Sequence, residues 1–163
     1  MTPSRGQTNA ERGFIIPIGG AVRKRRNPVI LEQFLEICGG NNAVIAVIPT
    51  ATKVEENGKV YSELFSAMGA SKVICLNINK RTDCNRDDYL SQIEESTGIF
   101  ISGGNQLRLS TILGGTPIAK LIRRLNADGV HIAGTSAGAA ILPEHMISGG
   151  RSGSLPTPRS VLL

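Results

Sequence analysis

Ser136 stands in a five-residue stretch whose residue types and spacing are those of a serine nucleophile. Gly134-Thr135-Ser136-Ala137-Gly138 reads G-x-S-x-G, with apolar runs at 130–133 before it and 139–142 after it. This pattern predicts a strand that turns abruptly into a helix and leaves the serine exposed at the bend. Backbone N–H groups at the start of that helix favour a developing oxyanion. The sequence therefore predicts Ser136 as a nucleophile, with a turn that does no chemistry as the alternative.

A second stretch, residues 98–107, predicts a strand, a double glycine and polar groups at the start of a helix. Successive backbone N–H groups at the Gly103-Gly104 turn would form an anion nest. A phosphate cradle is one interpretation, although the G-x-x-x-x-G-K-[ST] pattern is absent. The other is an oxyanion donor, the backbone N–H of Gly104 or Asn105, that reaches Ser136 from a neighbouring strand. A plain turn with Asn105 as helix cap is the third, and Gln106 either contacts a substrate or caps the helix.

A serine nucleophile needs a general base, and the chain contains two histidines. His131 lies five residues before Ser136, about 16 Å away along an extended strand. His145 lies nine residues after it, about 13 Å away and on the opposite face if the helix continued. We therefore expect neither histidine to complete a triad. A lysine such as Lys53, or a second chain, would have to supply the base.

Short apolar runs alternate with amphipathic stretches along the chain, which predicts an α/β fold with a parallel sheet covered by helices on both faces. Function then gathers at the carboxyl ends of the strands. Two of the expected helices place Ile30, Val60 and Ala67 on their inward faces. The expected strands are residues 14–18, 43–48, 73–78, 99–101 and 130–133, and the expected helices include 106–113 and one that Thr116-Pro117 begins.

The composition narrows the class of protein. The chain has 163 residues, a formal net charge of +5 and no tryptophan, and its one dense basic run, at 23–26, is interpreted as a solvated loop. Few aromatic residues argue against a nucleic-acid stacking platform. Three cysteines without a C-x-x-C pair favour neither a disulfide nor a metal site. We expect no cofactor, no membrane segment and a cytoplasmic location.

The two ends of the sequence differ from its middle. Residues 1–12 are polar and predict a disordered N-terminal tail, while residues 151–160 are polar and rich in glycine and proline. The apolar residues 161–163 suit the beginning of a strand. We therefore expect residues 13–163 to be the N-terminal portion of a single α/β domain whose remainder is absent.

Several motifs together resemble those of the cyanophycinases. They are Phe100-Ile101-Ser102-Gly103-Gly104-Asn105-Gln106-Leu107-Arg108-Leu109, the stretch from Gly134 to Ala140, Met146-Ile147-Ser148-Gly149-Gly150, residues 14–21 with their Gly-Gly end, and Ile48-Pro49-Thr50-Ala51-Thr52. The resemblance spans nearly all of the chain from Gly13 to Leu163. It implies a flavodoxin-like sheet of the class I glutamine amidotransferase type, in serine exopeptidases related to peptidase E.

The resemblance also implies an activity and roles for named residues. Cyanophycinases cut cyanophycin, a poly-aspartate that carries arginine on its side chains, to β-Asp-Arg dipeptides. Ser136 would be the nucleophile, backbone N–H groups near Gly104 and Ala137 would form the oxyanion hole, and Gln106 would lie in the substrate site.

In that family the catalytic histidine lies further downstream, so we expect this chain alone to be inactive. An α-aspartyl dipeptidase and a non-catalytic small-anion-binding module are the alternatives. Cyanophycin or an aspartyl peptide is the expected partner, with neither nucleic acid nor membrane, and a homodimer is the expected assembly.

Overall fold

A computed structural model describes residues 11–19, 28–52 and 55–146 of the chain. Outside these described residues lie the first ten residues of the expected tail at 1–12, the basic run at 23–26, Lys53 and residues 147–163. None of the described helices is long and apolar enough to cross a membrane.

Five parallel strands form the sheet in the described part of the chain, in the order β1-β5-β4-β2-β3. The strands β2 and β4 are neighbours. From β2 the chain continues to β3 on one side, and from β4 it continues to β5 on the opposite side. This reversal is the topological switch point of a doubly wound sheet, where ligands bind beyond the carboxyl ends of the strands. The bounds are β1 Ile15–Ile18, β2 Val44–Ile48, β3 Lys72–Cys75, β4 Gly98–Ile101 and β5 His131–Thr135.

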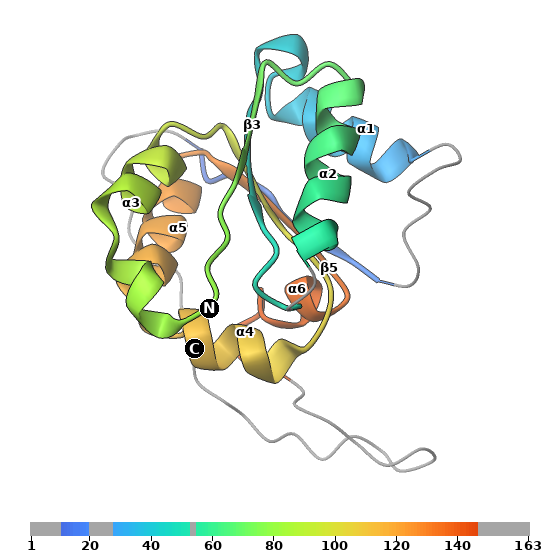
Figure 1. The fold of residues 1–163 in the computed structure, drawn as a ribbon. Coiled ribbons are helices and arrows are strands. Elements are labelled where there is room, and N and C mark those ends of the chain that lie inside the picture. Colours follow the sequence, from blue (N-terminus) through green and yellow to red (C-terminus); the bar gives the residue numbers. More distant parts are fainter. Residues whose placement is uncertain (1–10, 20–27, 53–54, 147–163) are drawn as a thin grey trace.

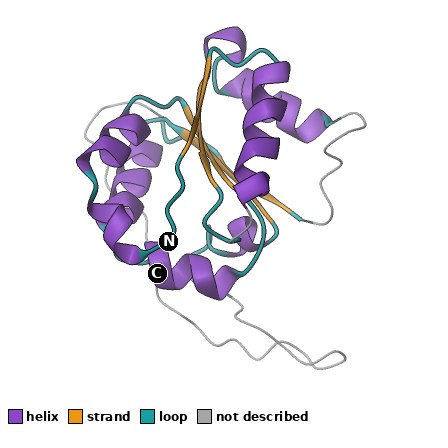
Figure 2. Cartoon of the chain, viewed as in Figure 1, coloured by secondary structure: helices purple, strands orange, loops and turns teal. Residues whose placement is uncertain are grey.

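Helices cover both faces of this sheet, as the alternating apolar runs predicted. In Figure 1, α1 and α2 lie on one side of the strands, and α3 and α5 lie on the other. The short α4 and α6 lie at the carboxyl ends of the strands, and Figure 2 shows the sheet between the helices. The bounds are α1 Val29–Ile37, α2 Glu55–Ala67, α3 Asp87–Glu94, α4 Gln106–Leu113, α5 Pro117–Ala127 and α6 Ala137–Ala140, with 3-10 turns η1 at Gly40–Asn42 and η2 at Arg81–Asn85.

The core divides into two layers because successive strand residues point to opposite faces. On the α1 and α2 side, Phe100 of β4 meets the rings of Tyr61 and Phe65, with centroids 4.6 and 5.2 Å away. On the α3 and α5 side, Ile99 and Ile101 join an aliphatic cluster. Both layers are buried, so the sheet is a rigid support for the loops at its carboxyl edge.

Three expectations about the helices were wrong in detail. Ile30 is 55% exposed and Val60 is 36% exposed, and Ala67 also faces solvent. In α2 the buried positions are instead Tyr61 and Phe65, because their large rings bury more apolar surface against Phe100 than the smaller residues could. Periodicity alone leaves the direction of an apolar stripe uncertain by about one position, and packing decides it.

Strand and cap positions also differ slightly from the expected ones. The pair Asn27-Pro28 predicts an N-cap followed by a proline at the first helical position, but Pro28 is itself the N-cap of α1. The ladder of β3 ends at Cys75, although the N–H of Leu76 still donates to the Val47 carbonyl at 2.9 Å. By contrast, α4 has the predicted bounds, and the Thr116 hydroxyl caps α5 with Pro117 at its start.

Candidate active site

Ser136 occupies the bend between β5 and α6. Its backbone has φ 50° and ψ −110°, the only positive φ of a non-glycine residue in the described part of the chain. Side chains other than glycine are rare in this conformation and are held there only by their surroundings. Ser136 is exposed, while Thr135 before it and Ala137 after it are buried. The bend therefore presents the hydroxyl to solvent on a rigid, strained backbone, as a nucleophile elbow requires.

The two arms of the bend touch through their glycines. A Cβ atom placed on Gly134 would lie 2.5 Å from the carbonyl carbon of Gly138. A Cβ atom placed on Gly138 would lie 2.2 Å from the carbonyl oxygen of Ile101 on β4. Both distances are far below van der Waals contact, so each position accepts only glycine. The spacing of G-x-S-x-G is thus a packing requirement of this fold, because two backbones cross where any side chain would collide.

The Gly103-Gly104 turn lies directly beside Ser136, because β4 and β5 are neighbours in the sheet. A Cβ atom on Gly103 would lie 3.2 Å from the Ser136 Cβ atom. Gly104 has φ 153° and packs so tightly on the Ala51 carbonyl that its own Cβ would lie 2.3 Å from that oxygen. In the described residues, no hydrogen bond engages the N–H of Gly103 or Gly104. Neither N–H group is therefore engaged elsewhere in the described structure.

Asn105, Gln106 and Ala137 occupy different places around this turn. The N–H of Asn105 donates to the Ala51 carbonyl at 2.8 Å, and its side-chain oxygen accepts from the N–H of Arg108 at 2.9 Å. Asn105 is therefore a helix cap whose own N–H is already bonded, so this N–H is not free for the oxyanion role expected of it. Gln106 is the half-buried first residue of α4. Ala137 is the first residue of α6, so its N–H has no carbonyl partner within that helix.

Neither histidine completes the site. His131 begins β5, at the end of the strand remote from Ser136, and its Nδ1 accepts the N–H of Phe14 at 3.0 Å. Its ring also stacks on the Phe14 ring at 5.4 Å. His145 is exposed beyond the end of α6. Within the described residues, no side chain hydrogen-bonds to the Ser136 hydroxyl. The elbow and the glycine turn are therefore assembled here without a base in contact.

A hollow of about 720 Å³ opens on the other side of the Gly104 turn. It lies between the segments that follow β2 and β4, at the topological switch point where such sheets bind ligands. Its lining combines a cation, amide and hydroxyl groups and the exposed apolar side chain of Leu107; the residues are Ala51, Thr52, Gly104, Asn105, Leu107, Arg108, Thr111 and Ile112. Gly104 thus lines this hollow and also belongs to the turn beside Ser136.

Sequence reasoning missed two features of the site. The hydroxyl groups of Ser102 and Thr135 are buried and have no hydrogen-bond partner within the described structure, although both residues adjoin the elbow. The guanidinium of Arg108 donates to the carbonyls of Thr50 and Asn79 at 2.9 and 3.1 Å. One signal in the sequence favoured a special role for Arg108. A cation in the first turn of a helix opposes the helix dipole, so a compensating contact is expected.

Comparison with known proteins agrees with this geometry. The family model described as Peptidase family S51 matches residues 14–160. The chain is 41% identical to a cyanophycinase from Geminocystis herdmanii over 147 residues, which are 89% of this chain and 54% of that protein. It is 40% identical to a cyanophycinase from Synechococcus elongatus over 152 residues, 92% of this chain and 47% of that protein. The chain thus spans about half the length of the curated relatives it matches.

Two solved structures share the fold at lower sequence identity. A peptidase from an acI-B1 actinobacterium superposes with a TM-score of 0.66 at 23% identity, over 81% of this chain and 56% of that one. A putative peptidase E protein from Listeria monocytogenes superposes with a TM-score of 0.60 at 23% identity, over 83% of this chain and 63% of that one. With the family match over residues 14–160, these findings place the chain in peptidase family S51.

Proposed function

We propose that this chain carries the nucleophile and oxyanion half of a cyanophycinase-type serine exopeptidase, which releases β-Asp-Arg dipeptides from cyanophycin. The observation that supports this most is the strained, exposed Ser136 beside the Gly103-Gly104 turn. The identity of about 40% to cyanophycinases over nine-tenths of the chain indicates the substrate. No other substrate class has comparable support.

In this mechanism the Ser136 hydroxyl attacks the carbonyl carbon of the scissile amide while a general base takes its proton. The carbonyl oxygen becomes an oxyanion, which the N–H groups of Gly104 and Ala137 stabilise. Gln106 contacts the substrate at the mouth of the site. Collapse of the tetrahedral intermediate expels the amine, and water then hydrolyses the acyl-enzyme.

In the described part of the chain no general base contacts the Ser136 hydroxyl, so we expect this part by itself to release no dipeptide. His131 already binds the Phe14 N–H, and His145 has no contact with Ser136 in the described structure. An unassisted serine hydroxyl is a weak nucleophile near neutral pH.

A chimera tests the proposal. Residues 14–160 replace the matching portion of the Geminocystis herdmanii cyanophycinase, and chromatography measures β-Asp-Arg release from cyanophycin. We expect activity that Ser136→Ala lowers about a thousandfold or more, with the fold unchanged by circular dichroism. Ser110→Ala is the matched control, because the Ser110 hydroxyl bonds only to the Leu107 carbonyl of its own helix. Near-full activity of the Ser136→Ala chimera would refute the nucleophile.

Testing the chimera on a second substrate distinguishes this function from the two alternatives, a dipeptidase and an anion-binding module. Hydrolysis of a free α-aspartyl dipeptide with no action on cyanophycin would instead identify an α-aspartyl dipeptidase. A folded chimera that acts on neither substrate, but whose residues bind phosphate in a titration of the isolated chain, would identify an anion-binding module.

A further inference from the structure

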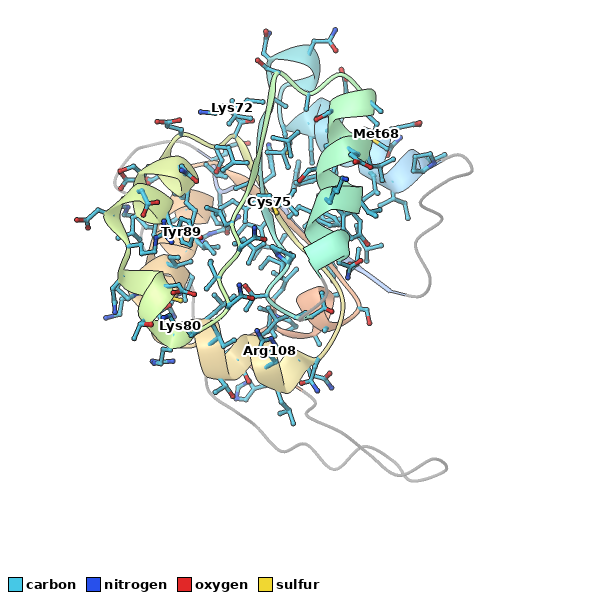
Figure 3. The ribbon with its side chains drawn as sticks, viewed as in Figure 1. Met68, Lys72, Cys75, Lys80, Tyr89 and Arg108 are labelled. Atoms are coloured by element: carbon cyan, nitrogen blue, oxygen red, sulfur yellow. The ribbon has the colours of Figure 1, made fainter. Side chains whose placement is uncertain are left out.

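Arg108 joins three segments that follow three different strands. It lies in the first turn of α4, which follows β4, and Figure 3 labels it beside the carboxyl ends of the strands. Its Nε donates to the Thr50 carbonyl after β2, at 2.9 Å. Its Nη2 donates to the Asn79 carbonyl after β3, at 3.1 Å. These partners are 58 and 29 residues away in the sequence. One planar guanidinium can bond both carbonyls at once, which an ammonium group cannot do in the same geometry.

The same segment is tied to the β2 loop a second time. The N–H of Asn105 donates to the Ala51 carbonyl at 2.8 Å, and the Asn105 side chain accepts the N–H of Arg108 at 2.9 Å. These hydrogen bonds form a closed circuit, which runs from Thr50 through Arg108 and Asn105 to Ala51, the residue next to Thr50. The Thr50 end is itself fixed, because its buried hydroxyl donates to the Ile78 carbonyl at 2.9 Å.

Gly103 and Gly104 lie between this circuit and Ser136. A Cβ atom on Gly104 would lie 2.3 Å from the Ala51 carbonyl oxygen, and a Cβ atom on Gly103 would lie 3.2 Å from the Ser136 Cβ atom. A shift of the β2 loop against α4 would therefore move the Gly103-Gly104 turn, whose N–H groups the proposed function assigns to the oxyanion. Because stabilisation of an oxyanion depends on donors within about 3 Å of its oxygen, a small shift would weaken it strongly.

We propose that Arg108 is a positioning residue, whose guanidinium fixes the Gly103-Gly104 turn against Ser136 by clamping the β2 and β3 loops to α4. The guanidinium acts through the backbone and does not touch the reacting atoms. The kinetic consequence of this inference rests on the proposed serine-peptidase function. Its structural consequence rests on the hydrogen bonds of Arg108 and Asn105 alone.

Two measurements on one pair of variants test it. Arg108→Met keeps most of the aliphatic stem and removes the fork. Arg81→Met is the matched control, because Arg81 Nη1 also donates to a backbone carbonyl of α4, that of Thr111 at 3.0 Å, in the last turn of the helix. In the isolated chain, we expect Arg108→Met to speed amide hydrogen exchange at Asn105 about tenfold or more, while Arg81→Met leaves that rate unchanged.

In the active chimera, we expect Arg108→Met to lower kcat by about a hundredfold with KM within about twofold, because it displaces oxyanion donors and not substrate contacts. The kcat of Arg108→Lys should lie between the values of Arg108→Met and the unsubstituted chimera. Arg81→Met should keep kcat within about twofold of the unsubstituted value. Equal exchange rates at Asn105 in both variants, or a loss confined to KM, would overturn the positioning role. An inactive parent chimera would refute the proposed function alone, and the exchange rates would still decide the role of Arg108.

Discussion

Replacing Ser136 by glycine should stabilise the isolated chain, because the serine backbone is held in a conformation that favours glycine. At φ 50° and ψ −110° a non-glycine residue costs on the order of 1–3 kcal/mol. Glycine loses about 0.5–1 kcal/mol more backbone entropy on folding than alanine does. The difference leaves Ser136→Gly about 1 kcal/mol more stable than Ser136→Ala. Ser136→Ala should match the unsubstituted chain, because the hydroxyl is exposed and makes no hydrogen bond in the described structure.

Urea denaturation followed by circular dichroism measures this difference, with the m value held equal among variants. For a chain of this size, the melting temperature should differ by about 2–4 °C. Ser66 supplies the control, because it lies on the exposed face of α2 in ordinary helical geometry. There glycine should be about 1 kcal/mol less stable than alanine. If Ser136→Gly is also less stable than Ser136→Ala, Ser136 is not strained and the elbow is misinterpreted.

Three further predictions follow from burial and close contact. Gly138→Val should cost about 3 kcal/mol or more, because even its Cβ would lie 2.2 Å from the Ile101 carbonyl oxygen, and an unchanged melting temperature would contradict this contact. Thr135→Val should keep or raise the free energy of unfolding, because the buried hydroxyl has no partner in the described structure. Thr50→Val should instead lower it by about 1–2 kcal/mol, because it removes the bond to the Ile78 carbonyl. Equal losses of the two variants in urea denaturation would disprove the distinction. Burial raises the pKa of the Cys38 thiol from 9.0 to about 12, so the folded chain should lose stability as pH rises through this interval, because only the unfolded thiol ionises readily. In Cys38→Ala, the free energy of unfolding should fall less steeply with pH. Parallel pH profiles of the two chains would contradict this prediction.

The sequence by itself determined the features that depend on neighbouring residues. The bounds of α4 and the Thr116 cap of α5 agree with the prediction, because capping side chains bond to N–H groups two or three residues away. The bend at Ser136 is local in part, since Gly134 lets the two arms approach each other, whereas Gly138 is required by the carbonyl of Ile101 on the neighbouring strand β4. Alternating apolar runs were also enough to predict a parallel sheet covered on both faces.

The tertiary structure alone decided which distant segments meet. Gly103 approaches Ser136 because β4 and β5 are neighbours in the strand order, which periodicity does not encode. Arg108 reaches the Thr50 carbonyl across 58 residues for the same reason. The inward face of α2 was likewise settled by the packing of Tyr61 and Phe65 on Phe100. Local sequence patterns specify elements, but strand order and close packing fix their contacts, because burial depends on the partner surface as well as on the residue itself.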